Sequence, residues 1–99
     1  MNDSRRSKLE IYVDILRVLA HHGPLKKTHI MYKAKVNCSV LKQFLDSLVQ
    51  QKLIEEQILR KKGQRIIYSI TERGKAALVN FEEINMALQT KKERGIEVI

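Results

Sequence analysis

The strongest hydrophobic pattern in the chain lies over residues 37–51. Apolar side chains recur there at steps of three and four residues, as on one face of an α-helix, and polar side chains occupy the opposite stripe. Asn37 stands just before the pattern and is suited to cap the helix. We therefore expect a helix with one packed face and one presented face. The packed positions are Leu41, Phe44, Leu45, Leu48 and Val49, and the presented ones are Ser39, Lys42, Gln43 and Asp46.

Two helices are predicted ahead of this one. Ser7 and Glu10 have the spacing of a capping box and precede a helical pattern over residues 8–20 that is apolar nearly all round. Such a helix is central in its domain, or its second face is covered by another chain. Gly23 and Pro24 end it. A short helix is then expected over residues 26–34, with Ile30, Met31 and Ala34 inward and Tyr32 in the core or at its rim.

The short helix and the helix after it are separated by a turn at Lys35 and Val36. Two short helices joined in this way form a helix-turn-helix, whose second helix enters the major groove of DNA. Asp46 is interpreted as an ordinary surface residue, because a carboxylate repels phosphate. Candidate DNA contacts are Ser39, Lys42 and Gln43 on the second helix and Lys26, Lys27, His29 and Lys33 at the first.

Beyond residue 52 the pattern changes from helical to extended. Residues 53–59 and 66–70 are β-prone, and Gly63 permits a turn between them, so a two-stranded hairpin, or wing, is predicted. Its loop carries a charge of +4. Like charges crowded at a hairpin tip do not help folding, which indicates a functional origin. The candidates for contact with phosphate or the minor groove are Arg60, Lys61, Lys62, Gln64 and Arg65.

A last helix is predicted from Thr71, which is suited to cap it. Ala77, Phe81, Ile84 and Leu88 follow at steps of 4, 3 and 4 and form a heptad seam of about two repeats. Gly95 is expected to stop the helix. The chain thus divides into a basic arm (1–7), a DNA-binding domain (8–70), a C-terminal helix (71–95) and an apolar tail (96–99).

The charge of the chain is basic and unevenly distributed. The 99 residues, enough for one domain with a thin margin of stability, carry a net charge of +8. Residues 1–71 hold 14 Lys and Arg against 6 Asp and Glu, whereas residues 72–99 hold 5 of each. A basic region of this kind suits a polyanionic partner, either nucleic acid or an anionic membrane surface. Arg5 and Arg6, in the arm, are candidates for contact with a neighbouring minor groove.

The sequence also bears on the compartment. No apolar run approaches the roughly 18 residues of a membrane span. The N-terminus lacks the apolar segment of a secretory signal. Cys38 is the single cysteine, so there is no disulfide framework within the chain, which fits a reducing compartment. We expect a cytoplasmic, nucleoid-associated protein without a membrane partner.

Enzyme and metal chemistry are not indicated. His21, His22, His29 and Cys38 are zinc-ligand types, but their spacing matches no common zinc pattern. No arrangement of His and acid that would activate Cys38 is recognisable. A Gly-rich phosphate loop and a paired-acid constellation are both lacking. We therefore expect no enzyme activity, no metal, no cofactor and no small-molecule substrate.

The order helix, helix, helix, hairpin, helix, with Thr-Glu-Arg-Gly-Lys at 71–75, resembles the winged helix-turn-helix family. Within it, Arg-Ser-Lys-Leu-Glu-Ile at 6–11 and Lys-Thr-His-Ile-Met-Tyr-Lys-Ala at 27–34 resemble the small chromatin-associated DNA-binding proteins of Sulfolobus and other crenarchaea. The similarity covers roughly residues 5–90. Where that family often has Leu-Ser-Tyr before the recognition helix, this chain has Val36-Asn37-Cys38, which keeps a cap but loses the Tyr.

The resemblance implies an α+β, mainly helical fold: a winged helix-turn-helix with three helices, a two-stranded wing and a C-terminal dimerisation helix. It further implies a homodimer that binds double-stranded DNA with little sequence preference. In that family, dimers form through an antiparallel coiled coil of the last helix, which places Ala77, Phe81, Ile84 and Leu88 at the dimer interface. Two alternatives stay open. One is a sequence-specific transcriptional regulator in which Lys42 and Gln43 read base edges, and the other is a winged-helix module that binds an acidic protein.

Overall fold

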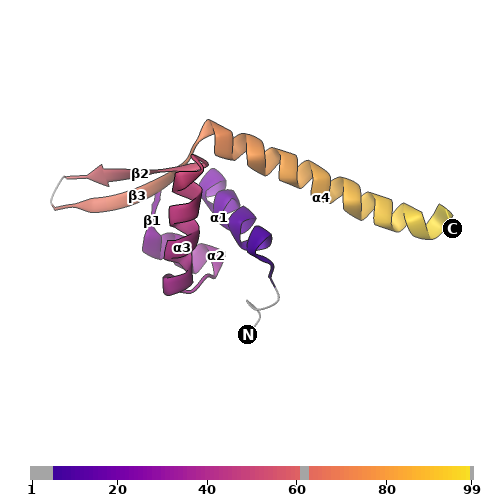
Figure 1. The fold of residues 1–99 in the computed structure, drawn as a ribbon, viewed down its shortest axis with the longest axis horizontal. Helices are drawn as coiled ribbons and strands as arrows, with labels where there is room; N and C mark the ends of the chain where they lie inside the picture. The colour runs from indigo at the N-terminus through magenta and orange to yellow at the C-terminus, as the bar shows by residue number, and fades with distance from the viewer. Residues whose placement is uncertain (1–5, 61–62, 99) are drawn as a thin grey trace.

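The computed structural model of the protein describes the backbone of residues 6–60 and 63–98 (Figure 1). Three helices and a small sheet form the body of the domain, and a long fourth helix extends away from it. The elements, in chain order, are α1 (Lys8–His22), β1 (Leu25–Lys26), α2 (Lys27–Ala34), α3 (Cys38–Gln50), β2 (Ile54–Leu59), β3 (Arg65–Ile70) and α4 (Glu72–Val98). The predicted winged helix-turn-helix is confirmed.

The helices begin where their capping residues predict. The Glu10 N–H donates to the Ser7 hydroxyl at 3.1 Å and the Ser7 N–H donates to the Glu10 carboxylate at 2.8 Å, which completes the capping box of α1. The Asn37 side chain accepts from the Ser39 N–H at 3.3 Å, and the Thr71 hydroxyl accepts from the Gly74 N–H at 3.0 Å. Each cap satisfies an N–H group that has no partner within its helix.

The sheet has three strands in the order β1-β3-β2, all antiparallel. The wing, comprising β2, β3 and their loop, is present as predicted, with Ile54 opposite Ile70 and Ile58 opposite Ile66. The sequence did not predict β1, which adds a third strand to the sheet beside the two-stranded wing and places Leu25 opposite Tyr68. Two residues are too few for any alternation of apolar and polar positions to mark a strand.

The core lies between α1, α2, α3 and the base of the sheet. The inward stripe of α3 is buried as predicted, at Leu41, Phe44, Leu45 and Leu48. Tyr12 of α1 meets Phe44 edge-on with ring centroids 4.6 Å apart. The side chains that are almost completely buried are Ile15, Leu19, Ile30, Leu41, Leu45 and Ile54.

The interpretation of Tyr32 as a core or rim residue was wrong. Ile30 is buried on α2, and Tyr32, two residues later, points about 200° around the helix from it. Its side chain is 73% exposed. The core packs on the side of α2 that carries Ile30 and Ala34, so a residue on the opposite side is left exposed.

The α4 helix differs from prediction at its end. It continues through Gly95 to Val98, so the expected stop at Gly95 was wrong, and residues 96–98 continue the helix. A single glycine costs a helix only about 1 kcal/mol relative to alanine, and no proline follows to interrupt the hydrogen-bond ladder. With 27 residues, α4 is about 40 Å long and accounts for much of the 62 Å long axis of the molecule.

Candidate nucleic-acid interface

The presented face of α3 is exposed as predicted. Ser39, Lys42, Gln43 and Asp46 all lie on the solvent side of the helix. The Ser39 hydroxyl donates to the Asn37 side chain at 3.1 Å, and the Lys42 ammonium lies 3.5 Å from the Asp46 carboxylate. Both partners of this ion pair are about two-thirds exposed, so the pair holds Lys42 weakly and leaves it able to turn to a phosphate.

The candidates at α2 differ in accessibility. Lys26, His29 and Lys33 are exposed, whereas Lys27 is half-buried at the first turn of the helix. The first turn has no side-chain cap and contains no acid, so no carboxylate of that turn offsets its positive dipole end. These features are compatible with contact to a DNA backbone, which stays a prediction.

The wing projects from the body beside α3 (Figure 1). Arg60, Gln64 and Arg65 are exposed on it, while Lys61 and Lys62 lie outside the described residues. Burial, together with the nearby carboxylates of Glu56 and Asp46, raises the pKa of the Tyr68 phenol at the base of the wing. The exposed cations of the wing, Arg60 and Arg65, stand at the ends of β2 and β3 that border the loop.

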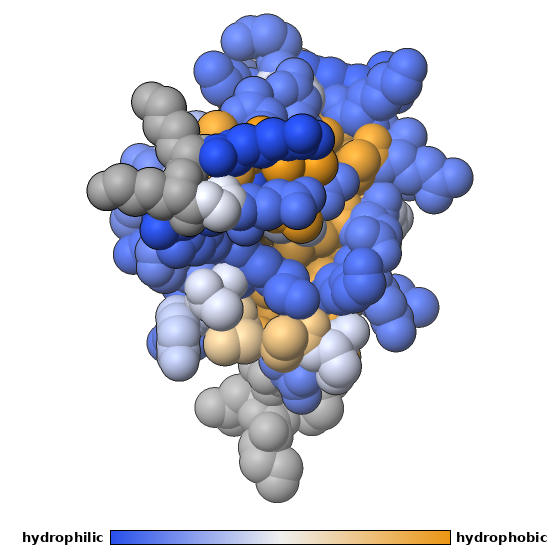
Figure 2. All heavy atoms as spheres, turned by 90° about the vertical axis from the view of Figure 1, so that its left-hand side faces the viewer, coloured by the Kyte–Doolittle hydropathy of each residue, from blue (hydrophilic) through white to orange (hydrophobic). Residues whose placement is uncertain are grey.

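Next to the basic loop, the hairpin carries three large aliphatic side chains that are exposed in the described part of the chain. Ile58, Leu59 and Ile66 are 47%, 45% and 42% exposed. Figure 2, which looks onto the side of the molecule where the wing projects, shows an apolar strip within a mostly hydrophilic surface. The sequence pattern marked these residues as strand residues but did not reveal that the hairpin extends beyond the core.

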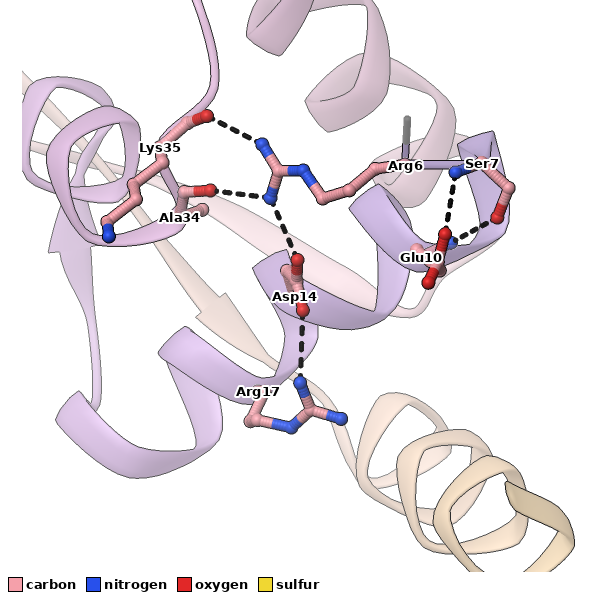
Figure 3. Close-up of polar contacts among 7 residues, drawn as sticks. All are labelled: Arg6, Ser7, Glu10, Asp14, Arg17, Ala34 and Lys35. Carbon is pink, nitrogen blue, oxygen red and sulfur yellow. Dashed lines mark hydrogen bonds and ion pairs between the residues drawn. The ribbon is translucent and has the colours of Figure 1, made fainter. Parts of the chain in front are cut away.

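Of the basic arm predicted over residues 1–7, the structure describes only Arg6 and Ser7. Arg5 lies outside the described residues. Arg6 is held against the domain: its guanidinium donates to the Asp14 carboxylate at 2.8 Å and to the carbonyl oxygens of Ala34 and Lys35 at 2.9 and 2.6 Å (Figure 3). Sequence reasoning also missed Asp14. The available signal was that Asp14 and Arg17 interrupt an otherwise apolar helical pattern.

The predicted heptad seam on α4 lies in two different surroundings. Ala77 and Phe81 are half-buried beside α1, where they line an apolar groove of about 230 Å³ together with residues of α1 and α3. Ile84 and Leu88 lie further out, and each is 59% exposed. The groove includes Leu9, Tyr12, Leu16, Leu48 and Leu53.

Two negative findings apply to the described residues. None of their helices is both long enough and apolar enough to cross a membrane. Among residues 6–60 and 63–98, His, Cys, Asp and Glu side chains do not gather in groups of three or more that could hold a metal ion. Cys38 is exposed at the start of α3 and forms no disulfide.

The fold and this arrangement define the class of protein: the chain belongs to the winged helix-turn-helix family, a class of DNA-binding domain, whose family model matches residues 5–89. It is similar to Sso10a-2, a DNA-binding protein from Sulfolobus solfataricus, with 31% sequence identity and a TM-score of 0.68 over 95% of this chain and 97% of that one. The resemblance found in the sequence is thereby confirmed.

Two transcriptional regulators have related structures. Reduced YodB from B. subtilis is 29% identical, with a TM-score of 0.66 over 73% of this chain and 71% of its own. A MarR family regulator from Silicibacter pomeroyi is 18% identical with a TM-score of 0.69, which shows the fold alone, and the chain spans 54% of it. Among curated proteins, no relative matches the chain.

Proposed function

We propose that the protein binds double-stranded DNA as a homodimer with low sequence specificity, as an architectural protein of the nucleoid. The observation that carries the proposal is that exposed cations project from α3, from α2 and from the wing of one winged-helix domain. Lys and Arg displace counterions condensed on the duplex, which supplies sequence-independent affinity. The similarity to Sso10a-2, whose match extends over nearly the full length of both chains, supports this function over that of the shorter-matching regulators.

The uncovered half of the α4 seam supports the homodimer. Ile84 and Leu88 are each 59% exposed among the described residues, so this part of α4 presents apolar surface. Pairing of α4 with the α4 helix of a second copy would cover these side chains. A dimer of this kind carries two DNA-binding faces and is suited to bridging or coating DNA.

Fluorescence anisotropy of two unrelated duplexes of equal length, each titrated at several salt concentrations, tests this function. We expect similar affinities and a shared, steep salt dependence. About five phosphate contacts per protomer correspond to a log–log slope near −4.5. Absence of binding to either duplex at physiological salt would refute DNA binding and favour a module that binds an acidic protein.

A sequence-specific transcriptional regulator is the second candidate. Gln43 is exposed on α3, and a glutamine side chain can form two hydrogen bonds with adenine in the major groove. The similarity to the transcriptional regulator YodB also supports this function. In this case one sequence should bind far more tightly than the bulk of a random duplex pool, and Lys42→Ala or Gln43→Ala should flatten that preference. A pool that yields no preferred sequence excludes the regulator.

A further inference from the structure

The side chain of Arg6 points toward Ala34 and Lys35, where the turn between α2 and α3 begins (Figure 3). Its Nη1 and Nη2 atoms donate to the carbonyl oxygens of Ala34 and Lys35, at the end of α2. The last carbonyls of a helix have no partner within the helix and need one from elsewhere. Lys35 adopts the left-handed conformation, with φ of 57°, and the Val36 N–H returns to the Met31 carbonyl at 3.2 Å. A residue 28 positions away in sequence thus caps α2 at the turn.

Asp14 holds the same guanidinium from α1. The Arg6 Nη1 lies 2.8 Å from Asp14 Oδ2, and Asp14 Oδ1 accepts from the Arg17 Nη1 at 3.0 Å. Arg17 Nε in turn donates to the Glu82 carboxylate of α4 at 3.1 Å. A chain of ion pairs therefore runs from the helix-turn-helix turn, across α1, to the long helix.

The Arg6–Asp14 pair is better sheltered than an ordinary surface ion pair. The two side chains are 20% and 28% exposed, against 68% and 65% for Lys42 and Asp46 on α3. A planar guanidinium can donate to two carbonyl oxygens and a carboxylate at once, which an ammonium on a flexible stem does not reproduce. The contacts of Arg6 therefore depend on the planar shape of its guanidinium group as well as on its charge.

We propose that Arg6 and Asp14 are positioning residues for DNA binding. Together they fix the turn before α3 against α1, so that the presented face of α3 meets the DNA groove in one orientation. The inference rests on the proposed DNA binding and assigns both residues a role in it. Arg6 acts through contacts inside the protein, and Asp14 supports binding to a polyanion although it is itself an acid.

The sign of the effect at Asp14 is the decisive test. Asp14→Asn makes the protein more basic, and charge alone would tighten binding to DNA. Loss of positioning instead predicts about three- to tenfold weaker binding to any duplex, and a similar loss for Arg6→Gln. The double variant should be no weaker than either single one, because both remove the same restraint. The salt slope should keep its wild-type value in Arg6→Gln, whereas loss of a direct phosphate contact would reduce it by about 0.9.

Two further variants separate shape from charge. Arg6→Lys keeps the charge but not the fork, so it should bind as weakly as Arg6→Gln. Glu72→Gln removes one acid from an exposed position on α4 that is distant in sequence from this turn, and it should bind as tightly as the wild type or more tightly. Thermal melts identify any variant that is unfolded at the assay temperature, and amide hydrogen exchange at residues 36–39 should be faster in the Arg6 and Asp14 variants only.

The outcomes are distinct. A wild-type protein that binds no duplex refutes the proposed function itself. A wild-type protein that binds, with a folded Asp14→Asn variant that binds equally or more tightly, overturns the positioning role. Retention of wild-type affinity by Arg6→Lys also overturns it, and assigns Arg6 to direct contact with phosphate.

Discussion

Phe81 and Ile84 stand three residues apart on one side of α4 but have different surroundings. Phe81 is half-buried in the groove beside Leu9 and Tyr12 of α1, whereas Ile84 is 59% exposed. Among the described residues, those of α1 flank the seam at Ala77 and Phe81. Beyond that point α4 extends from the domain, with Ile84 and Leu88 uncovered (Figure 1).

This difference identifies the substitutions that test the dimer. Ile84→Asp combined with Leu88→Asp should yield a folded monomer. Removing two carboxylates from water in an apolar interface is costly, so the dimer is lost. The monomer stays folded because neither residue belongs to the core. Sedimentation equilibrium measures the mass. Met86→Asp is the matched control: Met86 is 66% exposed and stands about 200° around the helix from Ile84, so this variant should remain dimeric. An unchanged mass in the double variant would exclude the proposed α4 interface.

The wing should contribute affinity without selectivity. Replacing both Arg60 and Arg65 by Gln should weaken binding to unrelated duplexes equally and reduce the magnitude of the log–log salt slope by about 1.8, because two phosphate contacts are lost. Arg73→Gln removes one exposed cation from the first turn of α4, outside the loop of the wing, and should leave the slope unchanged. An unchanged slope in the wing variant would show that these arginines do not contact phosphate.

Gly74 should be required for the junction between the wing and α4. A Cβ at this position would collide with the Leu53 carbonyl oxygen and lie 2.8 Å from the Ile70 side chain. The Leu53 carbonyl cannot move freely, since it accepts from both the N–H and the hydroxyl of Thr71. Gly74→Ala should therefore lower the free energy of unfolding by about 1–3 kcal/mol, despite the better helix propensity of alanine.

Urea unfolding measures this change, with Asn80→Ala as its control. Asn80 is exposed on the same helix. Alanine there should raise the free energy of unfolding by roughly a few tenths of a kcal/mol, through its higher helix propensity alone. A Gly74→Ala variant as stable as Asn80→Ala would mean that the close approach at Leu53 relaxes without cost.

Tyr68 should make stability depend on pH in the alkaline range. Burial raises the pKa of its phenol above the ordinary value of 10.0, and the Glu56 and Asp46 carboxylates raise it further. Between the unfolded and folded pKa values, the unfolded chain has lost the phenolic proton that the folded protein retains. The contribution of Tyr68 to the free energy of unfolding is therefore fully present below about pH 10. It is lost as the pH rises through the pKa of Tyr68 in the folded protein.

Tyr68→Phe should flatten that part of the pH profile, measured by urea unfolding between about pH 8 and pH 11. Tyr32→Phe serves as the control, because Tyr32 is 73% exposed and its substitution should leave the profile as in the wild type. An equal decline in both variants would assign the alkaline loss of stability to other groups, such as the lysines.

Much of the fold could be read from the sequence because the signals concerned are local. Capping residues at Ser7, Asn37 and Thr71 satisfy N–H groups within three positions of themselves, and the helical period over residues 37–51 marks the buried face of α3 directly. The same local sequence patterns also predicted the basic loop of the wing and the exposed face of α3.

The tertiary structure alone decided the features that depend on distant partners. β1 is a strand only because β3 passes beside Leu25, and Tyr32 is exposed because the core meets α2 on another side. Arg6 showed only a positive charge in the sequence, and the structure placed its guanidinium on Asp14 and on the end of α2. Short-range periodicity and capping are encoded within a few residues, whereas the partner of a long charged side chain is set by how the elements pack.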